Sequence, residues 1–206
     1  MKRRLFSWCL GLAACGLGIG TLLAGCAISD ARKIDAITAV NQGFRTEYEK
    51  ILAERGTRTY PVPVRDAFTA MRVTLAGLGM STERQDLALG YLAVAGAAPL
   101  PLTDAQWQAA AQADLPLLRR LIEPHVGMAA SFVQFEPQGL DVVISATFAE
   151  VARGTEVSMT VRLRETAPPR SGWPRREYVL PSAVRTGLDK IQSRFERELR
   201  AGPQRP

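Results

Sequence analysis

The alternation of apolar and polar residues in the last third of the chain is the feature that most constrains its fold. Every second residue is apolar over residues 140–148 and again over residues 157–163. Successive side chains of a β-strand point to opposite faces, so this pattern predicts two strands with one apolar and one solvated face. Turn residues stand beside them, in Pro137-Gln138-Gly139 and Ala152-Arg153-Gly154. Because the apolar face must be covered, other elements have to pack on it.

Shorter segments are expected to extend this sheet to five or six antiparallel strands. A strand is predicted at residues 133–135, just ahead of the long pair. Another is predicted at 57–62, where Pro61 and Pro63 favour a sheet edge or a strand end. Residues 80–86 and 89–95 are expected to form two strands joined by a turn. In the second of these, four residues are expected to share one face of the strand: Leu89, Tyr91, Ala93 and Ala95.

Two amphipathic helices are available to cover the apolar face of the sheet. Residues 64–78 and 182–200 both carry apolar side chains at helical spacing. In the last helix we expect Phe195 to be buried and its neighbour Arg194 to be exposed. A shorter helix is predicted at residues 44–53. The expected fold class is therefore α+β, an antiparallel sheet gripping two amphipathic helices.

The span 96–127 interrupts this order of strands and helices. Thr103-Asp104-Ala105-Gln106 fits a capping box, which predicts the start of a helix. Asp114, just ahead of Pro116, indicates a fresh helix start, and the apolar pattern then runs to Pro124. We therefore predict a two-helix insertion. If it is an appendage, removing residues 99–126 should leave the sheet and both gripping helices folded.

The N-terminus has the pattern of a secretory signal peptide. Three basic residues precede an apolar run that reaches Leu23, and small residues follow it. The stretch Leu23-Ala24-Gly25-Cys26 resembles the lipobox of bacterial lipoproteins. The resemblance implies that the chain is cut before Cys26 and that the Cys26 thiol is acylated. It also implies the outer membrane, facing the periplasm, because Ala27 rather than Asp follows the cysteine. The alternative is an uncleaved N-terminal anchor, and both place the rest of the chain outside the cytoplasm.

These features divide the chain into four parts. They are a signal peptide (1–25), a lipidated tether with a short helix (26–56), one α+β domain (57–200) and a disordered tail (201–206). Without the signal peptide, 23 basic residues face 20 acidic ones, a net charge of +3 with no basic block. Such a balance does not suit a nucleic-acid partner. Cys9 and Cys15 leave with the signal peptide, so the domain must be stable without disulfides.

A catalytic set is not evident in the sequence. The single histidine, His125, lies at the end of the predicted insertion with no G-x-S-x-G motif near a serine. We expect it to interact with the helix C-terminus. With one histidine and no free cysteine, the mature chain cannot build a His/Cys metal cluster, and its carboxylates are dispersed. We therefore predict a protein that is not an enzyme and holds no cofactor or metal.

Two tryptophans are candidates for contact with a partner. Trp173 lies in a loop between prolines with Arg175 and Arg176, and aromatic and Arg residues are enriched at interface centres. Trp107, in an alanine-rich predicted helix, is the other candidate. The alternative, which we favour for both, is a tryptophan that covers the edge of the core.

The order of elements over residues 57–200 resembles the helix-grip domains of Gram-negative envelope lipoproteins, such as those of the C subunit of the outer-membrane β-barrel assembly machinery. The matching segments are Arg58-Thr59-Tyr60-Pro61-Val62-Pro63, the helix from Ala67-Phe68 to Leu78-Gly79, Gly90-Tyr91-Leu92, and the last helix. The resemblance implies a helix-grip-like domain. The span 96–127 departs from that pattern, and no functional residue is carried over.

Two functions are compatible with these features. The preferred one is a non-catalytic, lipid-anchored envelope protein that binds a protein partner during envelope assembly or maintenance. The alternative is a periplasmic carrier of a lipid or small apolar ligand, held between sheet and helix. Four residues are expected to line such a site: Phe68, Met71, Phe148 and Met159. A cavity of about 300 Å³ or more would favour the carrier, and a solid core would favour the protein-binding function.

Overall fold

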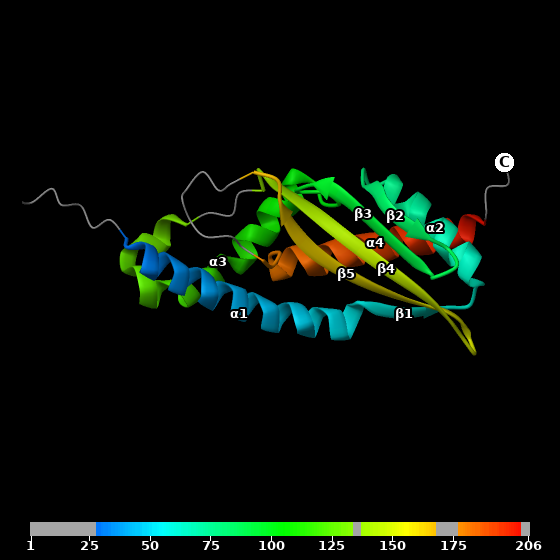
Figure 1. Cartoon of the computed structure of the whole chain (residues 1–206), viewed down its shortest axis with the longest axis horizontal. Coiled ribbons are helices and arrows are strands. Elements are labelled where there is room, and N and C mark those ends of the chain that lie inside the picture. Colours follow the sequence, from blue (N-terminus) through cyan, green and yellow to red (C-terminus); the bar gives the residue numbers. More distant parts are fainter. Residues whose placement is uncertain (1–27, 134–136, 168–176, 203–206) are drawn as a thin grey trace, which may run out of the picture.

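The computed structural model describes residues 28–133, 137–167 and 177–202. Within these ranges the chain is α+β, with four α-helices, one 3-10 helix and one five-stranded antiparallel sheet of order β1-β5-β4-β3-β2. Figure 1 views the sheet from its uncovered face, with α4 behind it. The α+β class and the antiparallel sheet predicted from the sequence are confirmed.

A long hairpin forms the centre of the sheet. It consists of β4, Leu140–Val151, and β5, Gly154–Glu165, paired from Leu140 with Glu165 to Val151 with Gly154. Gly154 has a φ of +123°, and a Cβ there would collide with the carbonyl oxygen of Tyr60. The turn therefore requires glycine at this position. Both strands bury every second residue through most of their length, as the alternation predicts.

The remaining strands lie to either side of this hairpin. Edge strand β1, Thr57–Tyr60, pairs with β5, while β3, Tyr91–Ala97, pairs with β4 and with the other edge strand, β2, Ser81–Asp86. The prolines that follow β1 fit its edge position. The predicted strand at 133–135 falls largely on residues 134–136, which lie outside the described residues, and Val133 follows a 3-10 helix.

Tyr91, Ala93 and Ala95 share one face of β3, as predicted, and this is the uncovered face of the sheet. Leu92 and Val94 are fully buried and pair with Ala146 and Ile144 of the covered face. Leu89 is 72% exposed, in the turn before the strand. Residues 92–95 are apolar without interruption, so periodicity does not show which of them point to the covered face. The register of pairing with β4 determines this.

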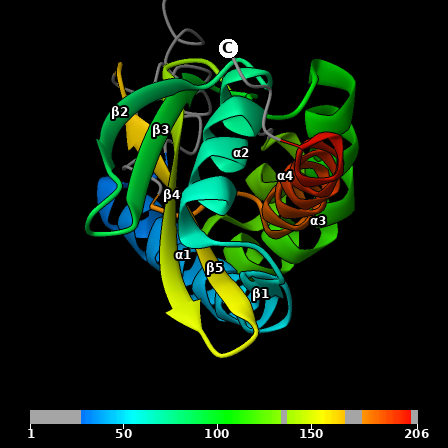
Figure 2. The same cartoon turned by 90° about the vertical axis from the view of Figure 1, so that its right-hand side faces the viewer.

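Two amphipathic helices cover one face of the sheet, as predicted. They are α2, Val64–Ala76, and α4, Pro181–Ala201, and Figure 2 shows them together on that side. Phe195 of α4 is completely buried, with its ring edge-on to that of Tyr60 at a centroid distance of 4.8 Å. The predicted tail begins inside this helix, because Ala201 is still helical, and residues 203–206 lie outside the described residues.

Helix α1, Asp30–Arg55, begins much earlier than the predicted start at residue 44. The Ser29 side chain accepts a hydrogen bond from the Arg32 N–H and caps the helix. Ala36, Ile37 and Val40 are buried, so the segment expected to be a tether contributes to the core. These apolar residues have helical spacing, but they stand among polar neighbours, and α3 supplies the surface that buries them.

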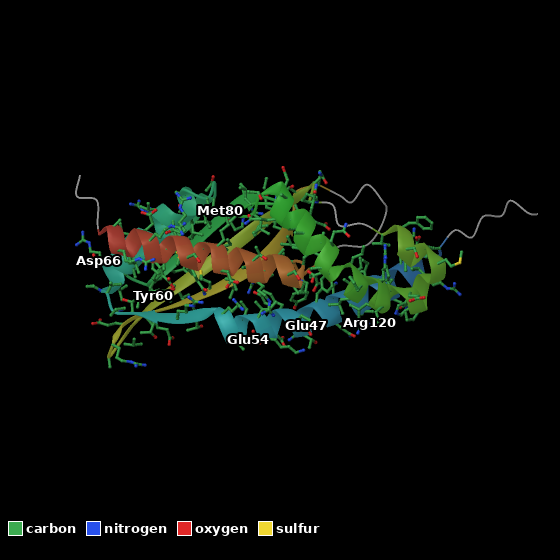
Figure 3. The ribbon with its side chains drawn as sticks, turned by 180° about the vertical axis from the view of Figure 1, so that it is seen from behind. Glu47, Glu54, Tyr60, Asp66, Met80 and Arg120 are labelled. Atoms are coloured by element: carbon green, nitrogen blue, oxygen red, sulfur yellow. The ribbon has the colours of Figure 1, made fainter. Side chains whose placement is uncertain are left out.

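One α-helix, α3, Asp104–Val126, occupies most of the span where two were predicted, and the 3-10 helix η1, Gly127–Phe132, follows. The predicted capping box at Thr103 and Gln106 is confirmed. Pro116 and Pro124 lie inside the helix, where each lacks the N–H of an i to i−4 bond. Figure 3 shows α3 changing direction along its length, so that it passes from α4 to α1.

The span 96–127 is part of the core rather than an appendage. Leu102, Trp107 and Ile122 are buried in the same cluster as the sheet and α4. The Lys190 ammonium of α4 donates to the carbonyl oxygen of Pro101, at 2.7 Å, and to Gln106 Oε1, at 3.0 Å. Among the described residues, no helix is long and apolar enough to span a membrane.

Candidate interaction surfaces

Side chains from neighbouring helices form hydrogen bonds with the ends of several helices. Asp114 of α3 caps α4: its carboxylate accepts from the Ser182 N–H at 2.8 Å and from Ser182 Oγ at 2.6 Å. The residue before α4, Leu180, offers no side-chain cap, so the cap comes from a distant segment. Burial raises the pKa of the Asp114 carboxyl, although the bonds from Ser182 act in the opposite direction. Asp114 was predicted to start a second inserted helix. It instead lies inside α3 and stabilises the start of α4.

Helix α4 in turn satisfies the C-terminal carbonyl groups of α1 and α2. Gln192 Nε2 donates to the Arg55 carbonyl oxygen, and the Arg194 guanidinium donates to the Gly77 carbonyl oxygen at 2.7 Å. Carbonyl groups at a helix end have no partner within the helix, so such bonds stabilise the packing of the helices. Arg194 was expected to be exposed, but it is half-buried and bonds another helix.

The edge of β5 beyond β1 is covered by α1. The Met159 N–H donates to the Gly56 carbonyl oxygen at 2.8 Å, where α1 passes into β1. Further along, the Val161 N–H donates to the Tyr48 hydroxyl at 3.2 Å. Covering an edge with a helix blocks pairing with another chain. This edge is consequently not a surface that a partner strand could extend.

The uncovered face of the sheet carries small and hydroxylated side chains. Ser145 and Thr147 of β4 stand beside Thr160 and Ser158 of β5. Ser158 Oγ lies 2.9 Å from Thr57 Oγ1, and Ser145 Oγ lies 3.4 Å from the Tyr91 hydroxyl. The residues of this face are mostly half-buried or exposed. The outward polar positions of β5 were expected from the alternation. Short side chains occupy the middle of the face, and the longer side chains of Glu156 and Arg162 of β5 and Tyr91 of β3 lie around them.

One end of the uncovered face carries a charged cluster. The Arg164 guanidinium lies 2.7 Å from a Glu83 carboxylate oxygen and 2.9 Å from an Asp141 carboxylate oxygen, so it links β5 with β2 and β4. Hydrogen bonds to these two carboxylates raise the Arg164 pKa. Because the three side chains are partly exposed, solvent weakens their attraction, and the cluster contributes little to stability.

A pocket between the sheet and α4 is small. Its volume is about 20 Å³, room for about one water molecule. Its lining is largely apolar and includes Leu102, Trp107, Ile144, Val161 and Ile191. None of the four residues expected to line a carrier site lines this pocket. A preformed ligand site has about 300–1,000 Å³, so this pocket does not meet the size expected of a carrier.

The residues singled out in the sequence are not brought together. Cys26, Trp173, Arg175 and Arg176 lie outside the described residues. Trp107 is only 4% exposed and belongs to the core, in agreement with the core alternative. His125 lies half-buried in the last turn of α3. Within the described ranges, no group of three or more His, Cys, Asp or Glu side chains is placed to hold a metal ion.

An exposed apolar pair at the end of the molecule had no counterpart in the sequence-based prediction. Met128 and Phe132 project from η1, in a segment predicted to lie between a helix and a strand. The only available signal was two large apolar residues outside any amphipathic pattern.

In the comparisons with known proteins, no family model, curated protein or solved structure matches this chain.

Proposed function

We propose that this protein is a non-catalytic envelope protein, anchored to the outer membrane through acylated Cys26, that binds a protein partner as an accessory factor in envelope assembly or maintenance. The observation that carries the proposal is the contrast between the two sides of the sheet. One side is packed with helices around a pocket of about 20 Å³, while the other presents a broad polar surface. A domain built in this way has more surface for a macromolecule than interior space for a ligand.

The resemblance to helix-grip domains belongs to the same proposal. Its support is the placement of α2 and α4 on one face of a five-stranded antiparallel sheet (Figure 2). The span that contains α3 departs from the simple pattern by adding a helix between α4 and α1. The carrier alternative would require α4 to move away from the sheet to open a larger cavity.

Site-specific photocrosslinking in cells tests the proposed function. A photoreactive amino acid is placed in the full-length protein at Thr147, which is exposed on the uncovered sheet face, or at Thr69, which is exposed on α2. The two positions start from the same residue type, so they form a matched pair. We expect one discrete protein adduct from position 147 and little or none from position 69.

A second measurement separates binding from chance proximity. Thr147→Arg should reduce co-purification of the crosslinked protein by about tenfold or more if this face lies at the centre of the interface. Thr69→Arg should leave co-purification unchanged. Absence of a protein adduct from position 147, together with stoichiometric co-purification of a lipid, would instead support the carrier.

A further inference from the structure

Among the residues that the structure describes, those at one end of the molecule belong to α1, α3 and η1. Figure 1 shows the start of α1 at one end of the long axis, beside the end of α3 and η1, with the β4–β5 turn at the opposite end. The two helices pack closely, since a Cβ added to Gly43 would lie 2.6 Å from Leu121 Cδ1. Ala36, Ile37 and Val40 are buried along α1 in this part of the molecule. We call the first turns of α1 together with η1 the helical tip.

The helical tip exposes large apolar side chains. Met128 is 87% exposed and Phe132 is 83% exposed, while Ala130 between them is buried and holds η1 against the domain. Ile34, on the first turns of α1, is also more than half exposed. Basic side chains lie on the same helices, at Arg32 of α1 and at Arg119 and Arg120 of α3, interspersed with acidic ones. Contact with a surface would therefore depend mainly on the apolar side chains.

The position of the helical tip in the chain indicates that a membrane is the surface it contacts. Asp30, the first residue of α1, follows Cys26 by four residues. Four residues of fully extended chain span at most about 14 Å. An acyl group on Cys26 buried in a bilayer would therefore keep the start of α1 within that distance of the bilayer surface. Leu89 is comparably exposed at the other end of the molecule, but no such tether holds it near a membrane.

We infer that the helical tip is a membrane-contact surface, with Met128, Phe132 and Ile34 entering the boundary between lipid headgroups and acyl chains. The inference rests on the proposed acylation of Cys26. Apolar side chains that lie at this boundary add to the binding supplied by the lipid anchor. The contact also orients the protein. Helix α1, with 26 residues, is about 39 Å long, so it carries the far end of the sheet away from the membrane.

Single-cysteine spin labelling of the full-length lipoprotein tests this inference. Once the signal peptide is removed, Cys26 is the only cysteine left and its thiol carries the acyl chain, so an introduced cysteine is the only reactive one. The variants are Met128→Cys and Phe132→Cys at the tip, with Leu89→Cys and Arg153→Cys as exposed controls at the other end. Each labelled protein is reconstituted into vesicles of phosphatidylethanolamine and phosphatidylglycerol. Its nitroxide is then tested for access to oxygen and to a water-soluble nickel chelate.

The expected result is preferential access of oxygen at positions 128 and 132, and of the nickel chelate at positions 89 and 153. Adding Phe132→Asp to the labelled Met128→Cys protein should return the label to water, whereas adding Leu89→Asp should not. Tip labels that remain as open to nickel as those at position 89 would overturn the inference. Tip labels accessible neither to oxygen nor to the nickel chelate would indicate a contact with protein, and this result would also overturn the inference.

Two controls separate this result from the lipid anchor itself. Flotation of the vesicles shows whether the protein is membrane-bound, and the mass of its N-terminal peptide shows whether Cys26 is acylated. Acylated protein that floats while its tip labels remain in water would contradict only the tip contact. Protein that is not acylated and does not float would contradict both the anchor and the inference that rests on it.

Discussion

At the scale of single residues, α4 contains neighbours with very different roles. Phe195 is completely buried against Tyr60, Arg194 caps the end of α2, and Arg197 is exposed. The amphipathic pattern distinguishes the apolar stripe from the polar face. It does not distinguish a polar residue that bonds another helix from one that faces water.

Substitution of Phe195 should test the packing of α4. Phe195→Ala removes a buried ring and leaves a cavity, so the free energy of unfolding should fall by about 3–5 kcal/mol. Arg197→Ala is the matched control and should change it by less than about 0.5 kcal/mol. Arg194→Ala should fall between the two, because it removes the partner of the Gly77 carbonyl group. Denaturant midpoints measure all three, and equal effects of Phe195→Ala and Arg197→Ala would contradict the burial of this helix face.

The carboxyl group of Asp114 should give the stability a pH dependence. Burial raises its pKa in the folded state, so between the unfolded and folded values the native protein binds more protons than the unfolded chain. The contribution of this group to the free energy of unfolding therefore falls as the pH rises from about 4. Asp114→Asn removes the titration and keeps an acceptor for Ser182. We expect the stability of the wild type relative to Asp114→Asn to decrease over this range, and thermal midpoints in a pH series would show a constant difference if this assignment is wrong.

At the scale of elements, α3 connects the parts of the helical layer. It lies between α4 and α1, caps the start of α4 through Asp114, and supplies buried residues such as Ile122. Helix α1 has a similar connecting role, because it covers the β5 edge at one end and packs on α3 at the other. The helical layer is therefore continuous from the sheet to the helical tip.

Deletion of residues 99–126 should abolish folding of the domain, contrary to the expectation from the sequence. The deletion would remove Trp107, Leu118 and Ile122 from the core and leave the buried face of α1 without its partner. Large apolar losses of this kind exceed the stability of a typical domain, about 5–15 kcal/mol. A variant with Ala98 joined to Gly127 by a short Gly/Ser linker, which leaves β3 complete, should show no cooperative thermal transition. A sharp thermal transition near the wild-type midpoint would show that residues 99–126 are an appendage and not part of the core.

At the scale of the whole molecule, the proposed anchor lies a few residues before α1, which begins at one end of the long axis. If Cys26 is acylated as proposed, the short chain between Cys26 and α1 would place the helical tip near the membrane, with the uncovered sheet face along the side of the molecule. A partner could reach this face without displacing a helix. This arrangement is a consequence of the proposed acylation, so the acylation is the first property to test.

Cys26→Ser should prevent acylation, because the hydroxyl cannot replace the thiol in the lipobox. We expect either release of the mature protein from membranes or accumulation of the precursor. Mass spectrometry of the N-terminal peptide and membrane fractionation measure these outcomes. In the wild type, the mature protein should fractionate with the outer membrane, since Ala27 follows the cysteine. Wild-type acylation in Cys26→Ser, or wild-type protein recovered only with the inner membrane, would contradict the corresponding part of the proposal.

Local periodicity was sufficient to predict several features of the fold. The β4–β5 alternation, the apolar stripes of α2 and α4 and the capping box at Thr103 were all predictable, since each is written within a few consecutive residues. The wet face of the sheet follows from the same alternation. Tertiary structure alone decided the face of β3, the early start of α1 and the roles of Asp114 and Arg194. These depend on partners far away in the chain, and the helical tip likewise exists only because α1 and α3 bring distant segments to one end.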